Sequence, residues 1–218
     1  MQNEMTNEEY FDVLTPKIED LRKLREIGKS IAAGIIGQSL LKEDFFFCAA
    51  TDRCMQLING FSNMLQERNL TCVGALLRLQ LDNCMRTYAA FIAEDKNAVI
   101  DCIISGNRID KQKSKHGDLL KDVYLKTELS KIDPGFSVVY DNTSGYIHFS
   151  DRAFYQTVKS CDNGIIEWGV GTPLLEKFNP LLIEAADAFI HFVELHFRIL
   201  SAVMESKERF DQEYQDKV

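Results

Sequence analysis

The segment that follows Pro180 constrains the fold more than any other part of this chain. It continues to the end of the sequence without a further glycine or proline, as expected of one long helix. Its polar residues recur at alternating steps of three and four and form a narrow stripe, which consists of Glu184, Asp187, His191, Glu194, Arg198, Ser201 and Glu205. A helix that is apolar over about two thirds of its circumference lies at the centre of a bundle or against a second subunit. We therefore expect a mainly α helical bundle and a homodimer.

Capping-type residues in front of prolines predict where further helices begin. The four pairs are Thr15-Pro16, Asp133-Pro134, Thr172-Pro173 and Asn179-Pro180. Thr6 and Glu9 make a capping box, so a first helix begins there and is interrupted or restarted near Pro16. Periodicity predicts helices at residues 42–67, 70–95, 97–105 and 116–131, and another from Pro134. Residues 27–38, which contain three glycines, fit either a loop or a poorly formed helix.

The hydrophobic period changes after residue 153. Two runs rich in aromatic and β-branched residues, 154–158 and 165–170, flank the turn sequence Asp162-Asn163-Gly164. We expect a small β-hairpin near residues 154–170. It must lean on the helices, because an isolated hairpin is marginal in water.

Length and composition fit a single helical-bundle domain over residues 1–218, since 218 residues that are 45% hydrophobic can bury a sizeable core. We divide it into an N-terminal helical arm (1–41), a core (42–152), the hairpin (153–171) and C-terminal helices (173–212). The first ten residues lack the basic start and apolar run of a secretory signal. No apolar stretch reaches the roughly 18 residues that a membrane span requires. We expect a cytoplasmic protein with no membrane partner.

Charge and cysteine usage narrow the function classes. A net charge of -8 argues against nucleic-acid binding through the overall field, although the basic stretch 107–117 offers a local site. The six cysteines show no CxxC spacing and are expected to be reduced core thiols. Motifs for phosphate-binding loops, dinucleotide folds, zinc proteases and serine hydrolases do not occur. We expect no metal and no cofactor.

Tyr140, Ser144 and His148 are the main candidate site. They recur at i, i+4 and i+8 in the helix expected after Asp133-Pro134, so they share one slowly drifting stripe. A phenol, a hydroxyl and an imidazole can position ligands and exchange protons, and only an imidazole has an ordinary pKa near neutrality. The alternative is a hydrogen-bonded seam between helices.

Arg78, Asp82 and Arg86 step by four along an otherwise apolar helix. Asp82 can pair with either arginine and leave the other guanidinium partly free. One interpretation is an internal salt-bridge ladder that fixes helix register. The other is that Arg78 or Arg86 projects towards His148 and holds a phosphate or an oxyanion.

The other histidines give no metal pair. His196 falls in an apolar seam of the last helix, where we expect a hydrogen-bonded core histidine. His191 lies on the polar stripe of that helix, so the two rings occupy different faces. His116 sits in the basic stretch and is expected to be solvated.

Three stretches of the chain resemble the paired helices of the HEPN superfamily of α-helical domains, as found in uncharacterised bacterial proteins. The matching residues are Asp52-Arg53 through Met64-Leu65, then Gly74-Ala75-Leu76-Leu77-Arg78-Leu79-Gln80-Leu81-Asp82 and Tyr88, and finally Tyr140 with Thr143-Ser144-Gly145-Tyr146-Ile147-His148. The resemblance covers about residues 42–152.

This resemblance implies a dimer, and for many HEPN domains a metal-independent ribonuclease of bacterial stress or phage defence. Such enzymes carry an Arg-x4-6-His motif, and this chain departs from it, because residues 141–143 are Asp, Asn and Thr. Arg108 precedes His116 by one residue too many. Catalysis would need Arg78 or Arg86 to supply the arginine from another helix.

Two functions follow as expectations. The first is a HEPN-like helical interaction or binding module, dimeric, in which the stripe is structural or binds a small polar ligand; RNA or a phosphate-bearing ligand is the expected partner. The second is a ribonuclease in which His148 acts as general base, an arginine neutralises charge on phosphorus, and Tyr140 and Ser144 orient the imidazole or the phosphate. The ribonuclease requires His148 to be accessible in a cleft that it shares with Arg78 or Arg86.

Overall fold

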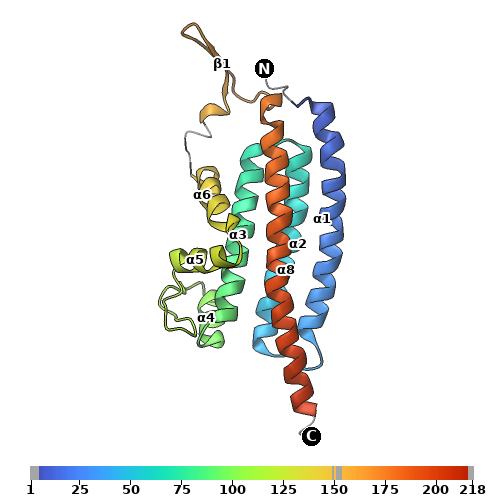
Figure 1. Ribbon diagram of the computed structural model, residues 1–218, viewed down its shortest axis with the longest axis vertical. Coiled ribbons are helices and arrows are strands. Elements are labelled where there is room, and N and C mark those ends of the chain that lie inside the picture. The colour runs from blue at the N-terminus through green and yellow to red at the C-terminus, as the bar shows by residue number, and fades with distance from the viewer. Residues whose placement is uncertain (1–4, 149, 151–153, 216–218) are drawn as a thin grey trace.

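The computed structural model describes residues 5–148, 150 and 154–215, and it confirms a mainly α fold with a hairpin appendage (Figure 1). The helices are α1 (Asn7–Ile36), α2 (Lys42–Gln66), α3 (Leu70–Ile92), α4 (Lys96–Ile104), α5 (Asp122–Ile132), α6 (Gly135–Ile147) and α8 (Asn179–Gln215). The strands β1 (Val158–Asp162) and β2 (Ile165–Trp168) pair antiparallel, and a short 3-10 helix, η1 (Glu176–Phe178), precedes α8. Residues 149, 151 and 152 of the predicted core and residue 153 of the predicted hairpin segment lie outside the described residues.

Four long helices form the bundle, in which α8 packs against α1 and α3, and α2 closes the ring between them (Figure 1). The polar stripe of α8 faces solvent: Glu184, Asp187 and Glu194 are exposed. The apolar residues between them are buried by the chain's own helices; Phe192 and Leu195 each expose 1% of their surface. At the centre, the rings of Phe61 and Phe189 stack with centroids 3.8 Å apart. The pattern of α8 is thus satisfied within one chain.

Helix α1 is continuous, so the predicted interruption near Pro16 is wrong, and Thr15-Pro16 does not start a helix. Pro16 lies on the exposed side of α1, where solvent can bond the backbone carbonyl that loses its partner. The glycine stretch is also helical up to Ile36. A Cβ on Gly34 would lie 2.2 Å from Sδ of Met204, so the missing side chain lets α1 approach α8 closely.

Two other helix starts differ from the prediction. Helix α5 begins at Asp122 rather than near residue 116, because the preceding loop is folded around the buried Ser114, whose backbone N–H donates to the carbonyl of Asp118 (2.8 Å). Thr172-Pro173 starts no helix. Arg68 donates to the carbonyl of Leu175 and holds that segment extended up to η1. The predicted starts at residues 133–134 and 179–180 are confirmed.

Helices α4, α5 and α6 form a second layer on α3, on the side away from α1 (Figure 1). Helix α6 lies on α3 through Tyr146, whose ring covers Gly74 so closely that a Cβ there would be 2.3 Å from the ring. At its other end, Asp133 accepts a hydrogen bond from the backbone N–H of Gly135 (3.0 Å). Among the described residues, no helix has the length and apolar character that crossing a bilayer requires.

Replacing Gly74 by alanine tests this close contact. We expect Gly74→Ala to lower the free energy of unfolding by about 1–3 kcal/mol, since the rigid ring of Tyr146 has to move. Gly60→Ala is the matched control, because a Cβ at this helical position would meet only Leu76 at 3.7 Å and alanine favours the helix by up to about 1 kcal/mol. Urea unfolding followed by circular dichroism measures both. Equal effects of the two substitutions would contradict the packing.

Candidate functional site

The structure brings Arg78, Ser144 and His148 to one shallow depression of about 210 Å³ between α3 and α6. Leu79 and Asp82 from α3 and Ile147 from α6 complete its lining. His148 lies just after α6, where its backbone N–H donates to the carbonyl of Ser144 (3.3 Å) and its side chain is exposed. Ser144 is also exposed, and its hydroxyl makes no hydrogen bond within the described part of the chain.

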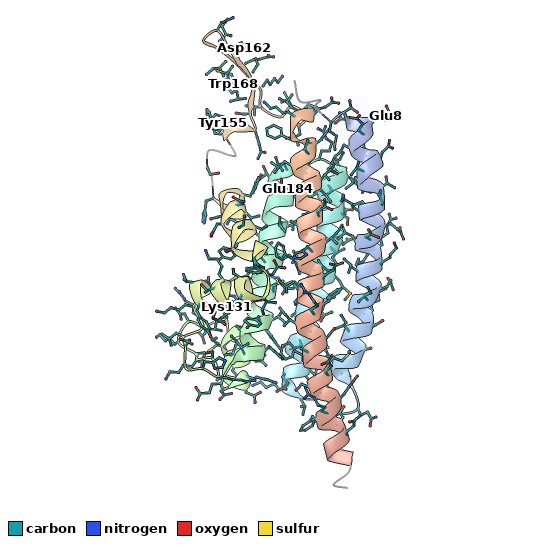
Figure 2. The ribbon with its side chains drawn as sticks, viewed as in Figure 1. Glu8, Lys131, Tyr155, Asp162, Trp168 and Glu184 are labelled. Carbon is teal, nitrogen blue, oxygen red and sulfur yellow. The ribbon has the colours of Figure 1, made fainter. Side chains whose placement is uncertain are left out.

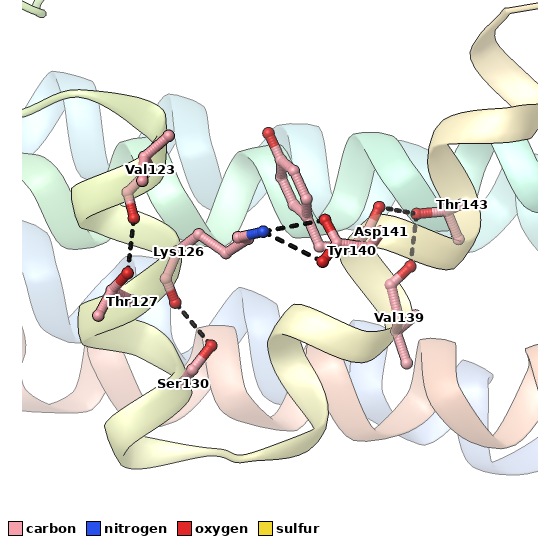
Figure 3. A network of polar contacts seen from close by, with 8 residues as sticks. All are labelled: Val123, Lys126, Thr127, Ser130, Val139, Tyr140, Asp141 and Thr143. Carbon is pink, nitrogen blue, oxygen red and sulfur yellow. Dashed lines mark hydrogen bonds and ion pairs between the residues drawn. The ribbon is translucent and has the colours of Figure 1, made fainter.

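Tyr140 does not line the depression, although the sequence placed it on the same stripe. Its ring lies under the guanidinium of Arg78, with Cζ of Arg78 3.4 Å from the ring centroid. Nζ of Lys126 lies 5.6 Å from the same centroid and pairs with Asp141 (2.9 Å), as Figure 3 shows. Tyr140 therefore acts on the depression through Arg78, whose guanidinium its ring supports.

The two arginines of α3 have different surroundings. Arg86 pairs with Asp82 (3.2 Å) and with Asp122 at the start of α5 (2.9 Å). Asp82 also faces Arg53 of α2 at 3.9 Å. Arg78, by contrast, forms no ion pair with any described residue, and its guanidinium stacks on the Tyr140 ring. A free guanidinium next to an already neutralised carboxylate favours an incoming anion.

This arrangement can bind a tetrahedral oxyanion. A guanidinium stacked on a ring keeps its N–H edge free for bidentate hydrogen bonds, and a serine hydroxyl adds a further donor. The imidazole of His148 can accept or donate a proton at the same place. Within the described part, no carboxylate bonds His148, so nothing there fixes its tautomer.

His191 of α8 contacts Asp133, and this interaction was not predicted from the sequence. Asp133 is buried, caps α6, and also lies 4.0 Å from Arg198. The Asp133-Pro134 pair predicted the start of α6, but no local pattern predicts that Asp133 also contacts His191, 58 residues further along the chain. This contact ties the start of α6 to α8 and so helps to place the depression.

The remaining histidines and the cysteines lie in other environments. His196 is buried, as predicted, and its Nε2 lies 3.0 Å from Oγ1 of Thr87, while its Nδ1 has no partner in the described structure. His116 is exposed in the basic loop. All six cysteines are unpaired, and burial raises the pKa of Cys54 to about 12, which makes that thiol unreactive. The described residues contain no group of three or more His, Cys, Asp or Glu side chains that could hold a metal ion.

Burial of His196 makes the stability of the fold depend on pH. Desolvation lowers the pKa of His196 to about 3, far below the value near 6.5 of an unfolded chain. Below about pH 6.5 the unfolded state therefore binds a proton that the folded state does not. The contribution of neutral His196 to stability is full above about pH 6.5 and is lost as the pH falls towards 3. From about pH 8 to about pH 5 we expect a loss of about 2 kcal/mol from this residue.

In the variant His196→Gln, urea unfolding at both pH values should not show this loss of stability on acidification. The variant His116→Gln, which removes an exposed histidine, should still show the loss. The same loss of stability on acidification in native protein and His196→Gln would contradict the assignment.

No family model, curated protein or solved structure matches this chain. These comparisons neither support nor refute the HEPN resemblance. Function is therefore inferred from the chain's own residues.

Proposed function

We propose that this chain is a dimeric helical binding module whose Arg78–Ser144–His148 depression takes a phosphate-bearing ligand. The observation that carries the proposal is the state of Arg78, a guanidinium without an ion pair among the described residues, in one depression with an exposed imidazole and a hydroxyl. Arg86 would contribute less, because Asp82 and Asp122 already occupy it.

The size and charge of the depression support a phosphate group. A volume of about 210 Å³ accommodates a phosphate and its water but not a drug-sized ligand. Arg78 and Asp82 are the arginine and the carboxylate that line it, and Asp82 is already paired with Arg86 and lies 3.9 Å from Arg53, so the charge of Arg78 remains available in a chain of net charge -8. Arginine forks match phosphate oxygens bidentately, which gives such a site its selectivity.

A metal-independent ribonuclease similar to HEPN enzymes is the second candidate. His148 is exposed and shares the depression with Arg78, which is the geometry that this activity requires. A second depression also takes in Arg86 of α3 and is lined by Arg108 and Lys121 as well as Asp110 and Asp122. Arg86 and Arg108 are paired with these two carboxylates, so Lys121 is the basic residue there that would meet a longer polyanion. In this second candidate, the protein would act in the cytoplasm of a bacterium, in stress or phage defence.

Phosphate binding tests the first candidate. On titration with inorganic phosphate, we expect the ring resonances of His148 in NMR spectra to shift, and Arg78→Ala to weaken this binding about 10- to 100-fold, as loss of a charged hydrogen-bond pair does. Arg78→Lys should be intermediate, because it keeps the charge without the fork. Arg22→Ala, which removes an exposed arginine paired with Glu19 on α1, should bind like the native protein. Unchanged affinity in Arg78→Ala would refute the site.

Incubation with labelled total RNA in chelator-containing buffer tests the second candidate. The ribonuclease proposal predicts cleavage by the native protein and by His116→Ala, and none by His148→Ala, since the general base would be lost. Gel electrophoresis of the products distinguishes the cases. No cleavage, or equal cleavage by native protein and His148→Ala, would reject the enzyme and leave the binding module.

A further inference from the structure

A cavity of about 440 Å³ lies between α3, α6 and the N-terminal part of α8. Tyr155 and Gln156, which precede β1, and Phe178 of η1 complete its lining. The volume falls in the range of small-molecule sites, roughly 300–1,000 Å³. The cavity shares no lining residue with the Arg78 depression, so it is a separate candidate site.

The cavity is open because α8 presents short side chains beside α6. At the start of α6, Phe136 meets Phe192 of α8 edge to face, with the ring centroids 5.5 Å apart. Nearer the N-terminus of α8, the residues of this helix that line the cavity include Leu181, Ala185 and Ala188. The alanine side chains are too short to fill the space, and Leu181 exposes 37% of its surface. Apolar surface of α8 is therefore left for a ligand to cover.

One carboxylate stands in this apolar lining. Among the described residues that line the cavity, Glu184 alone is charged, and its side chain forms no hydrogen bond or ion pair with any described residue. The next acidic residue of the same stripe, Asp187, is by contrast paired with Lys17. Of the polar lining groups, the hydroxyl of Thr143 donates to backbone carbonyls of α6, and the side-chain oxygen of Gln156 accepts a hydrogen bond from α3. The negative charge of Glu184 is therefore available to a ligand.

Three aromatic rings line the same cavity, those of Tyr146, Tyr155 and Phe178. Figure 2 shows Tyr155 and Glu184 towards the same end of the bundle, the end that carries the hairpin. The faces of aromatic rings attract organic cations, and a carboxylate supplies a full opposite charge. The rings and Glu184 thus favour ligands of the same sign.

We propose that this cavity binds a small organic cation, which carries a protonated amine or a quaternary ammonium group on an apolar body. The cationic group lies at Glu184, and the apolar body lies between α3 and α8, against Leu77 and Ala188. An anionic ligand would place its charge beside a carboxylate, and a neutral ligand would desolvate that carboxylate without pairing it. This site goes beyond the proposed function and does not rest on it, because phosphate would bind in the other depression.

Three naphthalene compounds of similar size and different charge test the proposal. Naphthylmethylamine is a cation at neutral pH, naphthylmethanol is neutral and naphthoate is an anion. NMR titrations that follow the methyl groups of Val139 and Ala188, which line the cavity, report both affinity and location. For the amine we expect a dissociation constant on the order of 1 mM, as fits a fragment of this size. It should bind about 3- to 10-fold more tightly than the alcohol, since Glu184 is partly solvated, and naphthoate should bind most weakly.

Substitutions separate the charge from the shape of the cavity. Glu184→Gln should lower the affinity for the amine to that for the alcohol and leave the alcohol unchanged. Glu194→Gln is the matched control, because Glu194 is an exposed glutamate of the same α8 stripe that does not line the cavity, and it should bind like the native protein. Ala188→Phe, which fills the cavity, should weaken binding of the amine and of the alcohol alike. Circular dichroism checks that each variant keeps its helices.

No saturable shift of the cavity methyl groups with the amine would overturn the proposal. Equal or tighter binding of the alcohol or of naphthoate would overturn the assignment of a cation, as would unchanged affinity for the amine in Glu184→Gln. Phosphate binding at Arg78 is titrated separately, so a failure of either site is recognised on its own.

Discussion

The burial of α8 on all sides but one is the constraint on which the rest of the structure depends. Its narrow polar stripe leaves apolar side chains that α1, α2 and α3 cover, and each fully buried leucine or phenylalanine contributes roughly 1.5–3 kcal/mol. Even the polar stripe organises neighbours, since Asp187 pairs with Lys17 of α1 and His191 bonds Asp133 at the start of α6. The sequence left open whether a second subunit covers α8; the chain itself does.

A buried ion pair sets the register at the far end of the bundle. Lys207 of α8 donates to Asp44 of α2 (2.6 Å), and the two side chains expose 4% and 2% of their surface. Asp44 also accepts from the backbone N–H of Leu41, so one carboxylate caps α2 and binds α8. Such a pair adds little net stability over apolar packing, but a shifted register would leave a charge buried alone, at a cost of roughly 3–5 kcal/mol. It therefore selects one alignment of α2 and α8.

Periodicity and turn chemistry predicted the helices and the existence and turn of the hairpin, because these are set by residues close in sequence. The first strand was misplaced at 154–158, since β1 is Val158–Asp162. The local rule failed at Pro16, which solvent exposure allows inside α1. It left the stretch around Gly34 open between loop and helix, and the close approach of α1 to α8 there is a tertiary feature. The stripe of Tyr140, Ser144 and His148 predicted one location for all three side chains, and the structure brings only Ser144 and His148 into the depression. Which arginine stays free depended on Asp122, 36 positions after Arg86, and no spacing rule reaches such a partner.

The candidate site has its two halves on different helices, so its geometry is inherited from the packing of α3 and α6. Arg78 is fixed by the Tyr140 ring, which belongs to α6; Ser144 follows on that helix and His148 comes directly after its end. Tyr146 on Gly74 sets the separation of the two helices, and Asp133 with His191 sets the start of α6. A misplacement of about 1 Å is enough to weaken a binding or catalytic constellation strongly. Residues that never touch a ligand, Gly74 above all, therefore determine whether a guanidinium, a hydroxyl and an imidazole act together.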